Sequence, residues 1–305
     1  MNTKIIADTG SDLSEELVDE LNIDMMSVII THNDKEYKDR IDIQADEIFR
    51  KQREGESFTT SQIPLFGYFE KFEQYAKEGQ DFIYISLSSG LTGGYNNAVF
   101  AVRELKEKYP DVRMAAVDSK AASVGYGLSL YLLAKMAKND ADFDELIEFS
   151  EYLSKNIRHA FTVFDMEYLY KGGRISRAQK SIGKLLNIRP IIIADSDGKL
   201  TVQELSRGNK VYKRMVEVIK EETHNRDLSN DIFMPVYGED KEITDIFIKK
   251  LESLEDAPKL NPQRLGSSIG VHTGPDIIGT AYLANEIPEK FRGRLQWNLI
   301  KKIRQ

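Results

Sequence analysis

Three short segments combine residue types that could hold a small anion. His272 lies between Gly270 and Gly274, where we expect the chain to turn from a strand into a helix. A histidine in such a turn suits ligand binding better than core packing, and a neutral imidazole can hydrogen-bond an anionic group. Hydroxyl groups in two earlier segments, residues 59–62 and 88–94, could complete the site if the three segments meet in space.

Residues 88–94 form a serine- and glycine-rich run that follows a predicted strand and opens a predicted helix. Glycines let the backbone approach a ligand closely, and free N–H groups at a helix start favour an anion. Ser89 and Thr92 add hydroxyl donors. The run lacks the lysine of a P-loop and the glycine spacing of a dinucleotide fingerprint, so a single carboxylate or phosphate fits better than a nucleotide.

The other polar segments have plausible structural roles. Residues 59–62 precede a predicted helix, and considered alone their hydroxyls are better explained as caps than as ligand contacts. Asp12 and Glu15 have the spacing of a capping box. Arg174 and Arg207 lie in basic turns that are either solvated or able to grip a phosphorylated group or an acidic partner.

The sequence shows no evident catalytic or metal-binding set. None of its four histidines is paired at metal-ligand spacing, and Gly-x-Ser-x-Gly is absent. Because the members of a Ser–His–acid triad meet only in space, an alternative stays open. In that alternative, the chain is a serine hydrolase or acyltransferase that uses Ser61 or Ser89 with His272.

The composition narrows the class of protein. The chain has 305 residues, no cysteine and a net charge of −7, with 42 Lys and Arg against 49 Asp and Glu. A negative balance argues against nucleic acid as the main ligand, because neutralising phosphates requires a basic surface. The start does not resemble a signal peptide and no stretch has the length of a membrane span, so we expect a cytoplasmic protein.

Alternating apolar strands and amphipathic helices in residues 1–165 predict an α/β domain with a parallel sheet covered on both faces. Residues 166–285 predict a mixed α/β domain with a hairpin around residues 195–198. Within it we expect a glycine-rich strand over residues 264–271 and a short helix over residues 277–284. Residues 286–305 predict a basic amphipathic tail helix, docked on its own domain or contacting a partner or anionic lipid.

Taken together, the order and spacing of these segments resemble the DegV family of bacterial fatty-acid-binding proteins, which includes the carrier subunits of fatty acid kinase. The resemblance covers about residues 3–285. It rests on six stretches, namely Asp8-Thr9-Gly10-Ser11-Asp12, Thr60-Ser61-Gln62, Ser88-Ser89-Gly90-Leu91-Thr92-Gly93, Val117-Asp118-Ser119, Lys171-Gly172-Gly173-Arg174-Ile175 and Ile269-Gly270-Val271-His272-Thr273-Gly274-Pro275.

The resemblance implies two α/β domains with one long-chain acyl group between them, and a non-catalytic carrier that needs no cofactor or metal. It implies that the carboxylate is presented to a separate fatty acid kinase for acyl phosphate formation. The implied ligand contacts are Thr60, Ser61 and Thr92, helped by Ser89, the Gly93 backbone and His272. Arg174 and Arg207 are implied to face the kinase.

Two positions differ in chemistry from the family pattern, and a third, Thr92, stands where many members have serine and keeps the hydroxyl. Ile63 stands before Pro64, where the family usually has proline directly after glutamine, and Asp276 follows Pro275 in place of glycine. We expect the first to shift the pocket mouth and the second to alter the turn beside His272.

Overall fold

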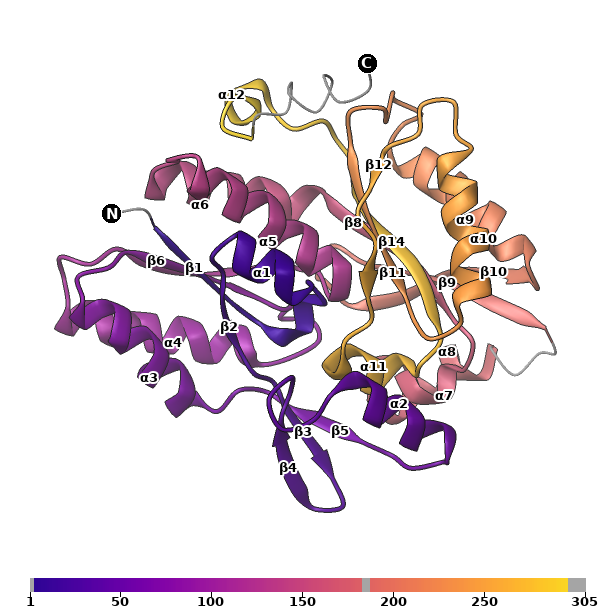
Figure 1. The fold of residues 1–305 in the computed structure, drawn as a ribbon, viewed down its shortest axis with the longest axis horizontal. Helices are drawn as coiled ribbons and strands as arrows, with labels where there is room; N and C mark the ends of the chain where they lie inside the picture. The colour runs from indigo at the N-terminus through magenta and orange to yellow at the C-terminus, as the bar shows by residue number, and fades with distance from the viewer. Residues whose placement is uncertain (1–2, 183–186, 296–305) are drawn as a thin grey trace.

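The structure, a computed structural model, describes residues 3–182 and 187–295 and contains three sheets (Figure 1). A four-stranded sheet is parallel throughout, as predicted. In spatial order its strands are β2 (Asp24–Met26), β1 (Lys4–Asp8), β6 (Phe82–Ser86) and β7 (Met114–Asp118).

Both faces of the parallel sheet are buried, because successive side chains of its strands point to opposite sides. Ile5 packs in one apolar cluster and its neighbour Ile6 in another. The Ile6 side is covered by α3 (Leu65–Lys77) and α4 (Gly94–Lys108). The Ile5 side is covered by α5 (Ser123–Lys138), with α6 (Phe143–Asn156) beyond it.

A small antiparallel sheet projects below the parallel one in Figure 1. The central β3 (Ile29–His32) pairs with β4 (Lys35–Lys38) and β5 (Thr59–Ser61). The short helices of this region are η1 (Thr9–Ser11), α1 (Glu15–Glu20) and α2 (Ala45–Arg53). The apolar run over residues 25–31 predicts a single strand, but the chain leaves the parallel sheet between β2 and β3.

The third sheet is mixed and spans the second half of the chain. Its strands run in the order β10 (Leu200–Arg207), β9 (Ile188–Ala194), β8 (Ile157–Val163), β14 (Ile277–Leu283), β11 (Ile232–Tyr237) and β12 (Lys259–Leu260), with β13 (Gln263–Arg264) also on β11. The helices are α7 (Met166–Lys171), α8 (Arg177–Ile182), α9 (Lys210–Glu222), α10 (Lys241–Glu252), α11 (Ser267–Thr273) and α12 (Glu289–Arg292).

Two predictions in the second half are wrong. The predicted strand over residues 264–271 is mostly helix α11, and the predicted helix over residues 277–284 is strand β14. β14 lies between β8 and β11 and all its residues are buried, so its apolar run does not alternate and gives no strand period. The glycine and serine content of α11 conceals a helix that is held by tertiary packing.

Helix α5 joins the two large sheets. Of its residues only Lys135 and Lys138 escape full burial, and it packs against β1 as well as β8, β11 and β14. The predicted domain boundary at residue 165 stays a prediction. β8, which precedes it, pairs with β9 and β14 of the mixed sheet.

The tip of the β9–β10 hairpin reaches the serine- and glycine-rich loop that follows β6. The Ser88 hydroxyl donates to the carbonyl of Gly198 at 2.8 Å, and Lys120 Nζ donates to the carbonyl of Ser196 at 3.0 Å. A Cβ on Gly90 would lie 2.6 Å from the carbonyl oxygen of Asp197, so only glycine allows this approach.

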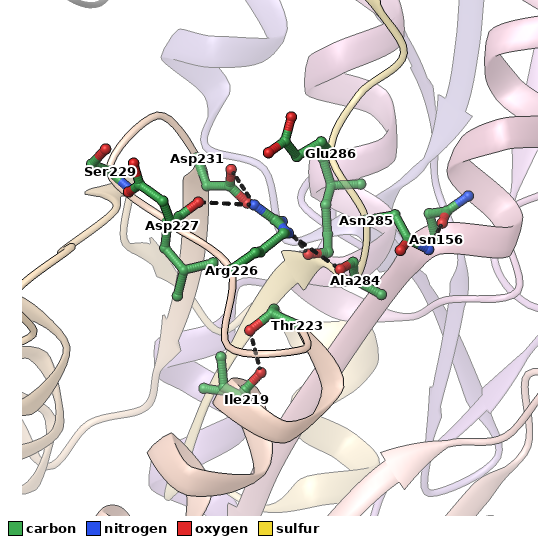
Figure 2. Close-up of polar contacts among 12 residues, drawn as sticks. Asn156, Ile219, Thr223, Arg226, Asp227, Ser229, Asp231, Ala284, Asn285 and Glu286 are labelled. Carbon is green, nitrogen blue, oxygen red and sulfur yellow. Dashed lines mark hydrogen bonds and ion pairs between the residues drawn. The ribbon is translucent and has the colours of Figure 1, made fainter.

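The ion pair between Arg226 and Asp231 lies at the end of the mixed sheet where β14 ends (Figure 2). Arg226 donates to both carboxylate oxygens of Asp231, with the Nη1–Oδ1 distance 2.9 Å. The same guanidinium donates to the carbonyls of Leu283 and Ala284, where β14 ends. Asn285 next to them donates to Asn156 at the end of α6.

The described start of the tail, up to Leu295, packs on α6. The rings of Phe291 and Phe149 lie 4.8 Å apart, and Arg294 pairs with Glu145 at 3.2 Å. The rest of the predicted tail helix, residues 296–305, lies outside the described residues. Among the helices of residues 3–182 and 187–295, none has both the length and the apolar character needed to cross a bilayer.

Candidate functional site

A cavity lies between the parallel sheet and the mixed sheet. It is bounded by β5, the starts of α4 and α5, helix α11 and strands of the mixed sheet. Most of its wall is apolar, with contributions from Leu87, Leu91, Val124, Phe161, Leu169 and Ile277. The predicted site residues Thr60, Ser61, Thr92 and His272 also line it.

Thr60 and His272 meet at this cavity across 212 positions of sequence, with Thr60 Oγ1 2.7 Å from His272 Nε2. Thr60 is held by β5, where it pairs with Ile30 of β3. His272 lies in the last turn of α11 rather than in the predicted strand-to-helix turn, and only 8% of it is exposed. Burial, helped by the nearby charge of Arg174, lowers the pKa of His272 to about 3.

The tautomer of the neutral imidazole decides which group can donate to a ligand. His272 Nδ1 is buried without a hydrogen-bond partner among the described residues. It lies against the backbone of Gly172, where a Cβ would overlap it. If Nε2 carries the proton and donates to Thr60 Oγ1, the Thr60 hydroxyl hydrogen is free to donate into the cavity.

The start of α4 supplies a second group of donors. Thr92 Oγ1 accepts from the Gly94 N–H at 3.4 Å, and the cavity wall includes Gly94 rather than the predicted Gly93. Gly93 is the N-cap residue of α4, which has no side-chain cap. The hydroxyl of Tyr68 would lie 2.9 Å from a Cβ on Gly94 and also lines the cavity. These groups suit an anion at a helix N-terminus.

The two serines proposed as nucleophiles are not paired with His272. Ser89 is exposed, lies outside the cavity wall and donates its hydroxyl to Asp118 Oδ2 at 2.5 Å. Ser61 is exposed at the cavity mouth, and the described partner of His272 Nε2 is Thr60. Neither arrangement has the nucleophile–base contact of a triad.

The two arginines of the basic turns lie in different surroundings. Arg174 lines the cavity and donates to the carbonyls of Leu91, at 3.3 Å, and Gly172. Burial lowers the pKa of Arg174, which nevertheless stays charged. Arg207 is exposed at the end of β10 and is not part of the cavity wall. Their predicted role in facing a kinase stays a prediction.

Two capping predictions are wrong. The residue before α3 is Pro64, which makes no side-chain cap bond, so the hydroxyls of residues 59–62 do not cap that helix. Helix α1 is capped by Ser14. Asp12 instead bridges two helix starts, because its carboxylate accepts from Gly266 N at 3.0 Å and from Ser123 Oγ at 2.6 Å.

A buried tyrosine network beside the cavity has no counterpart in the sequence motifs. Tyr84 donates to Asp8 Oδ2 at 2.8 Å, and the Tyr68 and Tyr84 hydroxyls lie 3.3 Å apart. Burial raises the pKa of Asp8 even though these donors oppose the shift. Asp8 and Tyr68 both line the cavity. Their positions are 60 residues apart and only the fold brings them together.

The two departures from the family pattern have clear contacts. Ile63 is buried and lines the cavity, next to the first turn of α3. Asp276 accepts from Arg53 Nη2 at 3.0 Å, and Arg53 also donates to Glu239. This ion pair ties α2 to the turn that follows His272.

A family model described as "Uncharacterised protein, DegV family" matches residues 2–285. A DegV domain-containing protein of Clostridium perfringens is 32% identical over 92% of this chain and 97% of its own length. One from Clostridium acetobutylicum is 33% identical over 92% of this chain and 98% of its own length.

Solved structures show the same fold. A DegV protein from Thermus thermophilus superposes with a TM-score of 0.84 at 24% identity, over 93% of this chain and 99% of its own. A protein from Eubacterium ventriosum, described as binding stearic acid, superposes with a TM-score of 0.84 at 27% identity, over 92% and 98%. Sequence match and fold agree with the resemblance seen in the motifs, and the chain belongs to the DegV family.

Proposed function

We propose that the chain binds one long-chain fatty acid in the cavity between its two large sheets and does not itself catalyse a reaction. The observation that carries the proposal is the Thr60–His272 contact at a largely apolar cavity that also includes Thr92. An amphipathic acid matches such a cavity, since its chain meets apolar walls and its carboxylate meets hydroxyl donors.

The energetics favour this ligand class. Each CH₂ group removed from water contributes about 0.8 kcal/mol, so a long chain dominates the affinity. The carboxylate must then find donors, because burying it without partners is costly. Thr60, Thr92 and the N-terminus of α4 provide neutral donors, and Arg174 adds a positive charge in the same wall.

Relatives with similar sequences support the ligand class. The Eubacterium ventriosum protein described as binding stearic acid is 27% identical to this chain. A Thermotoga maritima protein, described as having a fatty acid binding function, is 25% identical with a TM-score of 0.78.

We further propose that a separate fatty acid kinase phosphorylates the bound carboxylate. The chain has neither a P-loop nor a dinucleotide fingerprint, so the nucleotide has to come with a partner. The exposed Arg207 and the mouth-lining Arg174 are the residues we assign to that contact. A cytoplasmic location and a transient membrane contact of the basic tail remain predictions.

The experiment compares threonine-to-valine variants, which keep the side-chain shape and remove the hydroxyl. We expect Thr60→Val and Thr92→Val to lower fatty acid affinity roughly 10-fold each, as for a lost hydrogen bond to a charged group. Titration of delipidated protein with stearic acid measures the effect. Ser89→Ala is the matched control, because Ser89 lies outside the cavity wall.

Unchanged affinity in both valine variants would overturn the assignment of the carboxylate site. Hydrolysis of an ester substrate by the purified chain, abolished in Ser61→Ala, would favour the hydrolase alternative instead.

A further inference from the structure

The cavity wall contains two polar side chains, Ser268 and His159, that take no part in the Thr60–His272 contact. Ser268 is 4% exposed and lines the cavity, yet its Oγ has no hydrogen-bond partner among the described residues. His159 of β8 is 7% exposed and also lines the cavity. Its ring lies beside that of Phe161, with 6.0 Å between the ring centroids.

Ser268 lies one helical turn from His272, towards the start of α11. Ser268 precedes His272 by four residues on α11, so the two share a face and lie about 6 Å apart along the helix axis. Beyond Ser268, the N-cap Gly266 is joined through Asp12 to Ser123 at the start of α5.

The first turn of helix α5 lies close to the imidazole of His159. A Cβ on Gly125, two residues after Ser123, would lie 2.8 Å from His159 Nδ1. In the mixed sheet His159 pairs with Ala281, whereas Val163 pairs with Ile277, which follows α11 in the chain. His159 therefore lies four residues, or about 13 Å, along the sheet from that end, and it lines the cavity together with Val124 and Phe161.

Unpaired polar groups in an apolar wall usually have a partner that completes them. Burial lowers the pKa of His159 to about 4, with the charge of Arg158 adding to the effect. At neutral pH the ring thus offers one N–H donor and one acceptor nitrogen. A hydroxyl group, which both donates and accepts, is the matching partner.

We propose that Ser268 and His159 form a second polar subsite that accepts a hydroxyl group in the middle of the acyl chain. The inference rests on the proposed function and names the ligand class more closely: long-chain fatty acids that carry a mid-chain hydroxyl, in addition to unsubstituted ones. The carboxylate is held by Thr60 and Thr92, and the hydroxyl reaches the imidazole further along the cavity.

The test uses delipidated full-length chain, stearic acid, and a panel of stearic acids with one hydroxyl at different mid-chain carbons. An apolar wall would reject the hydroxyl by roughly 10-fold or more. We expect the natural chain to bind at least one positional isomer within about 3-fold of stearic acid, because one paired hydrogen bond offsets that loss.

The variants His159→Phe and Ser268→Ala test the residues. His159→Phe should weaken binding of the favoured isomer by roughly 10-fold and leave stearic acid binding within about 2-fold, which also shows that the variant is folded. Ser268→Ala should act in the same direction with less change of volume. Thr60→Val should instead weaken both acids alike.

The outcomes separate this inference from the proposed function. If stearic acid binds but every hydroxylated isomer is rejected 10-fold or more, or if both variants lower the two acids equally, the second subsite is wrong and the fatty acid carrier stands. If neither acid binds to the natural chain, both proposals fail.

Discussion

At the residue scale, the neutral charge state of His272 decides which group it contacts. A protonated imidazole would pair directly with a carboxylate, whereas the buried neutral ring orients the Thr60 hydroxyl. Considered alone, the local sequence placed His272 in a turn and favoured a cap for Thr60, whereas the family resemblance implied that both contact the ligand. Both roles are set by side chains that arrive from distant parts of the chain, which no local pattern records.

Tyr68 gives a prediction about the carboxylate site that the sequence could not supply. Its hydroxyl lies by Gly94 and Thr92, and burial raises its pKa, so it remains a donor at neutral pH. We expect Tyr68→Phe to weaken stearic acid binding about 3- to 10-fold, as for one lost hydrogen bond. Tyr75→Phe is the control, since the Tyr75 hydroxyl bonds Asp24 outside the cavity wall. Equal effects of the two variants would contradict the placement of Tyr68.

The buried histidines predict how stability depends on pH. Burial lowers the pKa of His159 from its usual 6.5 to about 4, so between these values the unfolded chain takes up a proton that the folded chain does not. The folded state therefore loses stability as pH falls through this window. Asp12, whose pKa burial raises to about 7, acts in the opposite direction, so total stability does not isolate the effect.

Comparing His159→Phe with the natural chain isolates the contribution of His159 to the pH dependence of stability. We expect the free energy of unfolding of the natural chain to fall relative to the variant by up to about 1.4 kcal/mol per pH unit near pH 5. Urea unfolding at several pH values measures the difference. A constant offset across that range would show that His159 titrates normally in the folded chain.

At the element scale, amphipathic helices with clear ends were predictable. The spacing of apolar residues predicts helices over residues 94–108, 143–156 and 210–222, and these are the bounds of α4, α6 and α9. Helix α11 and strand β14 were interchanged, because one is short and glycine-rich and the other is buried on both faces. In both cases tertiary packing outweighs the local period.

The approach of α7 to α11 depends on a single glycine. Gly172 caps the C-terminus of α7, and a Cβ there would overlap His272 Nδ1. We expect Gly172→Ala to destabilise the fold by about 1–3 kcal/mol and to weaken fatty acid binding by displacing the imidazole. Thermal unfolding and stearic acid titration measure the two effects.

The adjacent Gly173 provides a control with the opposite geometry. It has a φ of +72°, but a Cβ there would have no neighbour within 4 Å. Gly173→Ala should therefore cost about 1 kcal/mol through backbone strain and leave binding intact. A loss of binding in Gly173→Ala equal to that in Gly172→Ala would mean that the turn as a whole, rather than the contact with His272, is responsible.

At the scale of the whole molecule, the sequence predicted the sheets but not their junction. A parallel sheet and a mixed sheet with a hairpin follow from composition and periodicity. The cavity between them needs contacts such as Thr60 with His272 and Asp12 with Gly266, each more than 200 residues apart. Arg174 is part of that junction, although its basic turn indicated an exposed role.

The buried Arg226–Asp231 pair should contribute strongly to the stability of the mixed sheet. Removing one partner leaves an uncompensated buried charge, so we expect Arg226→Met to lower the free energy of unfolding by about 3 kcal/mol. Arg214→Met, which removes an arginine paired with three glutamates on the surface of α9, should cost less than about 1 kcal/mol. Equal losses in urea unfolding would refute the distinction.

The hydrogen bond from Ser88 to Gly198 couples separation of the two large sheets to binding of the ligand carboxylate. This bond joins the loop that carries Thr92 to the β9–β10 hairpin of the mixed sheet. Separation of the two sheets would therefore also displace the residues proposed to bind the ligand carboxylate. Bound lipid must therefore resist that separation with a free energy equal to the affinity lost on opening. If the proposed function holds, the same reciprocity means that a partner that binds the hairpin in its detached position would weaken lipid binding without contacting the lipid.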